Sequence, residues 1–159
     1  MSLASLLSLP MNSNAASYKK AAILSASPER LILMLYDGAL DAMRRAKAGF
    51  QLEDIKARNE MISNNLIKAQ NIFGELQRSL KMDKSSEFTD QMYGLYDFYV
   101  MKLNEANFKK IEEPIDVVID LFSDIRDAWS EMLSQQKVKA EVVRPARGAG
   151  VGGGISLRA

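Results

Sequence analysis

The sequence contains no cysteine and no histidine. Disulfide bonds and thiolate chemistry are therefore excluded, and the absence of cysteine fits a protein of the reducing cytoplasm. Nearly every common zinc site needs one of these two residue types, and so do the Glu-x-x-His pairs of di-iron helical bundles. Phosphotransfer through histidine is excluded for the same reason. We accordingly expect no metal site and no cofactor.

Long hydrophobic runs and a strong net charge are also missing. No apolar stretch approaches the roughly 20 residues of a transmembrane helix. The N-terminal segment MSLASLLSLP has no basic residue and its leucines are interrupted by serines, so we expect no signal peptide. The formal net charge of +1 provides no overall field for nucleic acid or an anionic membrane. From Lys137 onward five basic residues stand against one acid, which leaves about −3 for residues 1–136.

Glycine and proline are scarce between Pro28 and Gln136, where apolar residues recur at the three- and four-residue steps of α-helices. Ser27, Pro28 and Glu29 have the pattern of an N-cap, a first-turn proline and an acid near a helix N-terminus. The predicted segments are an extended, lid-like N-terminal segment at 1–27, helices at about 28–48, 53–80, 86–107 and 112–136, and a basic glycine-rich tail at 137–159. Helices of this length joined by short turns favour an all-α, antiparallel up-and-down four-helix bundle, followed by a disordered tail.

Each predicted helix carries one apolar stripe that we expect to face the core. The stripe of the second helix alternates steps of four and three, with Asn59 as its one polar member. The expected core positions are Leu31, Leu35, Gly38 and Ala42; Ile55, Asn59, Ile62, Leu66, Ala69, Phe73, Leu76 and Leu80; Phe88, Met92, Leu95, Tyr99, Leu103 and Ala106; and Ile115, Val118, Phe122, Ile125, Trp129 and Met132. Three further apolar residues, Leu33, Tyr36 and Leu40, point away from the first stripe. We expect the chain before Ser27, or a partner when one is bound, to cover them.

The second and third helices each carry an additional stripe beside the core stripe. These stripes are Met61, Asn65, Lys68 and Ile72 on the second helix and Tyr93, Tyr96, Val100 and Asn107 on the third. They mix apolar, aromatic, amide and long basic side chains, a composition suited to the rim and floor of a binding groove. Side positions of bundle helices also pack against neighbouring helices, and tyrosines often shield the edge of a core. Spacing alone favours neither interpretation.

Catalysis has little support in the sequence. Asp37 and Asp41 are one helical turn apart, but no histidine, cysteine, serine elbow or glycine-rich phosphate loop accompanies them. Carboxylate pairs at this spacing usually lie on a solvated helix face. We expect no active site, and the protein is not expected to be an enzyme.

Four segments, SASPERLILMLYDGAL, NLIKAQNIFGEL, LYDFYVMKLNEAN and DIRDAW, occur in this order on or beside the four predicted helices. Together they resemble the flagellin-export chaperone family, FliS, and the resemblance spans roughly Tyr18 to Met132. It implies a four-helix bundle in the bacterial cytoplasm that binds the disordered C-terminal segment of flagellin. Such a chaperone keeps flagellin from polymerising before it reaches the flagellar type III export apparatus, whose components the resemblance suggests as further partners.

The resemblance favours the groove interpretation of the two side stripes, because their amide and lysine residues match family motifs and are poor core choices. It also matches Tyr18 to a tyrosine that the family carries before its first helix. We expect this residue and its apolar neighbours to dock along the bundle until a client displaces part of the segment. The predicted partner-binding residues are Tyr18, Ile23, Leu24, Met61, Asn65, Lys68, Ile72, Tyr93, Tyr96, Val100 and Asn107. One departure is the turn MDKSSE, which lacks the glycine usual in the family.

A different class of function fits the same stripes. A non-catalytic helical-bundle adaptor would bind another folded protein through the second and third helices, and a labelled flagellin peptide would separate it from a chaperone. Nucleic-acid binding would need a basic stripe on the bundle, and only the tail is basic. We therefore expect no nucleic-acid partner and no membrane insertion, and both a monomer and a homo-oligomer stay open.

Overall fold

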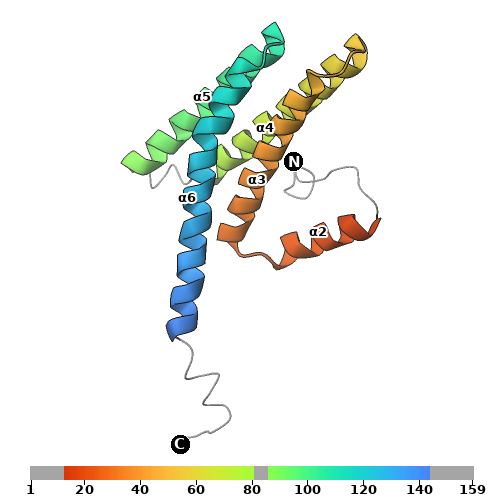
Figure 1. Ribbon diagram of the computed structural model, residues 1–159. Coiled ribbons are helices and arrows are strands. Elements are labelled where there is room, and N and C mark those ends of the chain that lie inside the picture. The colour runs from red at the N-terminus through yellow and green to blue at the C-terminus, as the bar shows by residue number, and fades with distance from the viewer. Residues whose placement is uncertain (1–12, 81–85, 144–159) are drawn as a thin grey trace, which may run out of the picture. The chain divides into compact units, whose positions relative to one another are not determined.

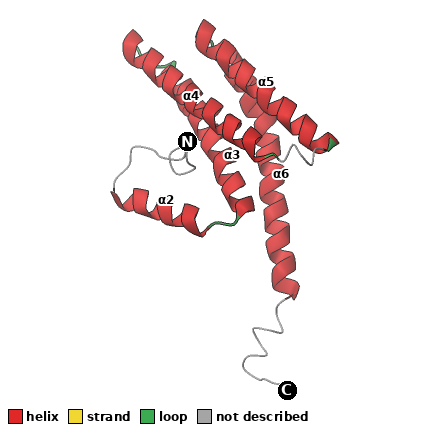
Figure 2. Cartoon of the chain, turned by 180° about the vertical axis from the view of Figure 1, so that it is seen from behind, coloured by secondary structure: helices red, strands yellow, loops and turns green. Residues whose placement is uncertain are grey.

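The structure is a computed structural model that describes residues 13–80 and 86–143, and every regular element in these residues is an α-helix. The helices are α2 (Ser13–Ser25), α3 (Pro28–Gly49), α4 (Ile55–Ser79), α5 (Glu87–Lys109) and α6 (Glu113–Val143). Figure 1 shows them along the chain, and Figure 2 shows helices joined by short loops in the described part. The all-α class is confirmed.

Two segments that were not predicted to be helical contain helix: α2 lies within the predicted N-terminal segment, and α6 extends into the predicted tail. Residues 1–27 were expected to be extended, which is wrong for Ser13–Ser25, the residues of α2. The flexible tail was expected from residue 137, but α6 continues to Val143. Both segments are rich in residues that favour helices and contain neither glycine nor proline. The rest of the predicted tail, residues 144–159, lies outside the described residues.

Side-chain caps define where the helices begin. Ser27 Oγ accepts a hydrogen bond from the Arg30 amide at 3.1 Å, which confirms the predicted cap of α3. Asp54 caps α4 and Ser86 caps α5 in the same way. At the end of α3, a Cβ on Gly49 would lie 3.1 Å from Ile62 Cγ1 and 3.2 Å from the Ile62 backbone nitrogen. The glycine therefore permits the close approach of α3 and α4 beside their turn.

The chain divides into two compact units, Met1–Arg126 and Asp127–Ala159, with the boundary inside α6. In the first unit α3 packs along α4, and α4 packs along α5. Its core is an aromatic cluster to which α3, α4, α5 and α6 each contribute. The Phe122 ring centroid lies 4.9 Å from that of Tyr36, 5.0 Å from Phe73 and 5.6 Å from Tyr99. In the second unit the described part is helical, with Trp129 half-buried and Val138 exposed.

Most of the predicted core positions are buried; Asn59, Leu80, Leu95, Ile125, Trp129 and Met132 are half-buried, and two positions are exposed. Ile55 and Phe88 are exposed although they belong to the predicted stripes. Each lies in the first turn of its helix, where the neighbouring helices give little cover. Leu31 and Gly38 of α3 are only half-buried.

The apolar residues predicted to point away from the α3 stripe belong to the core. Leu33, Tyr36 and Leu40 are all buried. Tyr36 packs against Phe122 of α6, and its hydroxyl lies 3.1 Å from the Tyr96 hydroxyl of α5. The prediction that the chain before Ser27 covers Tyr36 is therefore wrong, since the other helices cover it.

Candidate functional site

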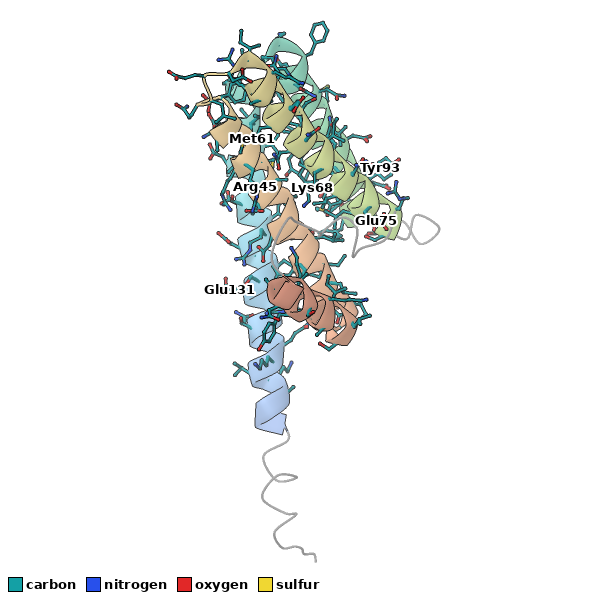
Figure 3. The ribbon with its side chains drawn as sticks, turned by 90° about the vertical axis from the view of Figure 1, so that its right-hand side faces the viewer. Arg45, Met61, Lys68, Glu75, Tyr93 and Glu131 are labelled. Atoms are coloured by element: carbon teal, nitrogen blue, oxygen red, sulfur yellow. The ribbon has the colours of Figure 1, made fainter. Side chains whose placement is uncertain are left out.

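The predicted side stripe of α4 divides between a half-buried edge and the core. Met61, Asn65 and Lys68 are half-buried. Figure 3 shows Met61 and Lys68 along α4, with Arg45 of α3 beside them. The Asn65 side-chain amide donates to the Met61 carbonyl at 2.8 Å, within the same helix. These three residues form the edge of α4 that is nearest to α3.

Positive charge gathers around Lys68. Partial burial lowers the pKa of Lys68, and the nearby cations Lys19 and Arg45 lower it further. Asp41 acts in the opposite direction, and its carboxylate accepts a hydrogen bond from Arg45 at 2.9 Å. Lys19 of α2 and Arg45 of α3 thus act on Lys68 of α4 as like charges, and Asp41 of α3 opposes them.

The two aspartates considered for catalysis are each engaged by an arginine. Asp37 accepts a hydrogen bond from Arg126 Nε at 2.6 Å, and Asp41 accepts from Arg45. Ion pairs of this kind link helices or stabilise one helix face. Within the described ranges, no group of three or more acidic, cysteine or histidine residues could hold a metal ion.

Two predicted partner-binding residues are core residues. Ile72 of α4 and Tyr96 of α5 are almost completely inaccessible to solvent. Their placement on an exposed side stripe is wrong. The physical reason is that α4 packs against both α3 and α5, so it buries a wider arc of its surface than a single stripe. Tyr96 is drawn inward by the aromatic cluster and the bond to Tyr36.

The other three residues of the α5 stripe follow the line where α5 meets α4. Tyr93 is exposed, Val100 and Asn107 are half-buried, and the three recur every seven residues. Opposite them on α4 lie polar residues with the same spacing, and we name this line the α4–α5 seam. It consists of Ser63, Gln70 and Gln77 of α4 and Tyr93, Val100 and Asn107 of α5.

Hydrogen bonds cross the α4–α5 seam along its length. The Gln77 amide nitrogen donates to the Tyr93 carbonyl at 3.1 Å, and the Gln70 amide nitrogen donates to the Val100 carbonyl at 3.1 Å. At the end of the seam near the α3–α4 and α5–α6 turns, Asn107 Nδ2 donates to Ser63 Oγ at 3.1 Å. Sequence reasoning did not find the α4 members of the seam. Their polar character and seven-residue spacing place them on one face of α4, but do not identify the helix that lies opposite.

Exposed apolar side chains lie beside the seam on the side away from the core. On α5, Tyr99 is buried, Val100 lies on the seam and Met101 is exposed, and the same order holds for Ala106, Asn107 and Phe108. On α4, Ile67 likewise follows the buried Leu66. We name the surface formed by Ile67, Met101 and Phe108, together with the exposed seam residue Tyr93, the outer face.

Phe108 gives the outer face its most prominent apolar group. Its side chain is 90% exposed, and it helps to line a shallow hollow of about 640 Å³ together with Asn104, Glu105 and Asn107. In Figure 3, Tyr93 and Arg45 lie on opposite sides of α4. An exposed aromatic ring beside amide groups can contact both apolar and polar parts of a partner segment.

The predicted docking of the N-terminal segment is wrong for two of its three residues. Tyr18 is 81% exposed and Leu24 is 77% exposed, whereas Ile23 is half-buried. The half-buried face of α2 includes Ala15, Lys19 and Ile23, which recur every four residues. Once the segment is helical, only one of its faces can turn inward, so Tyr18 and Leu24 stay accessible.

Comparison with known proteins shows the family to which the chain belongs. The family model described as flagellar protein FliS matches residues 11–136. The chain is 33% identical over 120 residues to the flagellar secretion chaperone FliS of Bacillus subtilis, covering 76% of this chain and 86% of that protein. It is 35% identical over 114 residues to the flagellar secretion chaperone FliS of Salmonella typhimurium, covering 71% and 82% of the two chains. The chain belongs to the FliS family, and the resemblance found in the sequence is confirmed.

A solved structure has a similar fold. It is a crystal structure of a bacterial flagellar chaperone, with a TM-score of 0.59 and 18% sequence identity. The similarity covers 77% of this chain and 98% of that one. Among the described residues, no helix combines the length and the hydropathy that a membrane span requires.

Proposed function

We propose that this chain is a cytoplasmic export chaperone that binds the disordered C-terminal segment of flagellin. Binding would prevent premature polymerisation and keep flagellin competent for flagellar type III export. Membership of the FliS family supports the proposal, since relatives in Bacillus subtilis and Salmonella typhimurium are flagellar secretion chaperones. The proposal includes no catalytic step, no nucleic acid and no membrane insertion, and it allows export-apparatus components as later partners.

The outer face is the observation that carries the proposal. Ile67, Met101 and Phe108 expose large apolar side chains on adjoining helices, although the same helices have a well-buried core. Exposed apolar groups that gather beside ordered polar groups are typical of protein-binding surfaces. The exposed Tyr18 and Leu24 of α2 add apolar surface outside this face.

The physical mechanism is competition for the client's apolar surface. The terminal segments of flagellin are amphipathic and pack helix against helix in the filament. A chaperone that covers those apolar positions therefore prevents the same contacts between flagellin molecules. A long client segment can bury about 1,600 Å² or more, but ordering it costs about 2–5 kcal/mol, which moderates the affinity and suits later release.

The scaffold that we infer for this activity is the antiparallel up-and-down four-helix bundle of α3 to α6. The pairings of α3 with α4 and of α4 with α5, and the aromatic cluster to which four helices contribute, support it. A rigid scaffold holds the binding side chains in place before the client arrives, so less ordering is required on the chaperone side.

Titration of an isotope-labelled flagellin C-terminal peptide with the full chain tests the proposal. Binding predicts shifted or broadened peptide resonances, whereas an adaptor for another folded protein predicts an unchanged spectrum. Ile67→Asp should weaken peptide binding about tenfold or more, because one apolar contact of about 1.5–3 kcal/mol is lost. Leu121→Asp on α6 is the matched control, because Leu121 is 47% exposed and Ile67 is 46% exposed. Equal loss in both variants would contradict the assignment to the outer face.

A further inference from the structure

Two glutamines of α4 make the same pair of contacts with α5, seven residues apart. Gln70 Nε2 lies 3.1 Å from the Val100 carbonyl and 2.7 Å from Asn104 Oδ1. Gln77 Nε2 lies 3.1 Å from the Tyr93 carbonyl and 2.7 Å from Asp97 Oδ1. In each case one amide group bonds a backbone carbonyl and a side-chain oxygen one helical turn further along α5. We name each such set of contacts an amide clamp.

The geometry of an amide clamp specifies both spacing and register. A shift of α5 along α4 by one residue moves its atoms by about 1.5 Å, enough to break bonds of 2.7 and 3.1 Å. Because the two clamps are two helical turns apart, they also oppose rotation of α5 about its own axis. An apolar contact at the same positions would resist sliding and rotation much less, because it has no preferred direction.

The carbonyls held by the clamps belong to the residues predicted to bind the partner. Tyr93 and Val100 are both members of the α4–α5 seam, and the outer-face residue Met101 follows Val100 directly. Because α5 is a regular helix, fixing its position and rotation on α4 also fixes the directions in which its side chains leave the backbone. The clamps therefore act on the same part of α5 that carries the exposed apolar side chains.

We propose that Gln70 and Gln77 are positioning residues of the partner-binding surface, which set the register of α5 on α4 and thereby the placement of the outer face. This inference rests on the proposed function, because it concerns the surface to which the flagellin segment binds. Neither glutamine needs to touch the partner. The glutamines hold Tyr93, Val100 and the side chains next to them in the arrangement that the partner meets.

The location of the clamps distinguishes positioning from stabilisation of the core. The bonds to Asn104 and Asp97 are solvent-exposed, and bonds of this kind add little to global stability because water competes for the same groups. A methionine at either position would keep the length and the helix propensity of glutamine but could not donate a hydrogen bond. The substitution therefore removes the clamp while leaving the fold intact.

The first test compares Gln70→Met, Gln77→Met and the double variant with the wild-type chain. We expect the double variant to bind the labelled flagellin peptide at least about tenfold more weakly while its urea-unfolding midpoint stays close to wild type. The carbonyl ¹³C resonances of Tyr93 and Val100 should shift, because each loses a donor. Gln91→Met is the control, since the side-chain amide of Gln91 contacts Glu87 of the same helix at 3.5 Å, and it should leave binding unchanged.

The second test reverses the polarity of one clamp. Gln77→Glu places a carboxylate against Asp97 and should weaken binding, whereas Gln77→Glu combined with Asp97→Asn restores one donor–acceptor pair at unchanged net charge. The double variant should recover part of the lost affinity. Recovery of stability without any recovery of binding would overturn the positioning role.

The failures of the two proposals can be told apart. If the wild-type chain does not bind the peptide, the proposed function fails and this inference fails with it. If the wild-type chain binds, and the Gln70→Met and Gln77→Met double variant binds equally well after its carbonyl resonances have shifted, only the positioning role is refuted.

Discussion

Tyr99→Phe should make the protein more stable, although it removes a hydroxyl group from the aromatic cluster of the core. Tyr99 is completely buried, and its hydroxyl finds no hydrogen-bond partner among the described residues. Phenylalanine would keep the ring contacts to Phe73 and Phe122, at centroid distances of 5.3 and 5.6 Å. The only group lost is the one that folding removes from water without compensation.

The size of the effect follows from that missing bond. Burying a hydroxyl without a partner costs about 1–3 kcal/mol. We expect Tyr99→Phe to raise the free energy of unfolding by about 1–2 kcal/mol, after allowing for relaxation around the ring. Tyr96→Phe should have the opposite sign, since it removes the hydroxyl that lies 3.1 Å from the Tyr36 hydroxyl. A loss of about 1 kcal/mol is typical of removing such a bond.

Urea unfolding followed by far-ultraviolet circular dichroism measures both variants. With a slope of about 2 kcal/mol per molar urea, the midpoint of Tyr99→Phe should rise by about 0.5–1 M at unchanged slope. The midpoint of Tyr96→Phe should fall. A lower midpoint for Tyr99→Phe would refute the reasoning, because it would mean that the hydroxyl contributes a favourable interaction.

Three further predictions follow from burial and charge. Leu66→Ala should lower the free energy of unfolding by about 2–5 kcal/mol, because Leu66 is buried. Lys68→Ala should change stability little and weaken peptide binding, because Lys68 is half-buried. Equal unfolding midpoints would contradict the placement of Leu66 in the core and of Lys68 at the edge of α4. Tyr18→Ala should leave the unfolding midpoint unchanged, because Tyr18 is 81% exposed, and should lower peptide affinity in the same titration. Burial raises the pKa of Tyr99 to about 12, so the unfolded state loses its proton first and stability should fall between about pH 10 and 12. Tyr99→Phe should reduce that loss in urea titrations at these pH values.

Local features of the chain were predictable because their causes are local. The cap at Ser27 needs only its own side chain and the amide of Arg30, three residues away. The core stripe of α4 was predictable from the spacing of Ile62, Leu66 and Phe73, because helical periodicity places such residues on one face whatever they pack against. The absence of cysteine and histidine narrowed the possible chemistry in any fold, because no arrangement of the helices can supply a side chain that the chain lacks.

The burial of the side stripes depended on which helices meet. Ile72 follows Lys68 by one helical turn, yet one is in the core and the other is half-exposed. Spacing does not separate them, because the width of a buried arc depends on how many neighbours a helix has. The packing of α4 against two helices buries Ile72, and the aromatic cluster draws Tyr96 inward.

The amide clamps also arise only in the tertiary structure. Gln70 and Val100 are 30 residues apart, and nothing in the sequence near either residue identifies the other as its partner. A side chain can be assigned to a helix face from periodicity, but a hydrogen bond between two helices depends on their distance, rotation and register. The sequence by itself determined the helices between Pro28 and Gln136, most of the core and the family. The packing of α4 with α5 decided which side chains form the seam and the outer face, because those contacts join residues that are distant along the chain.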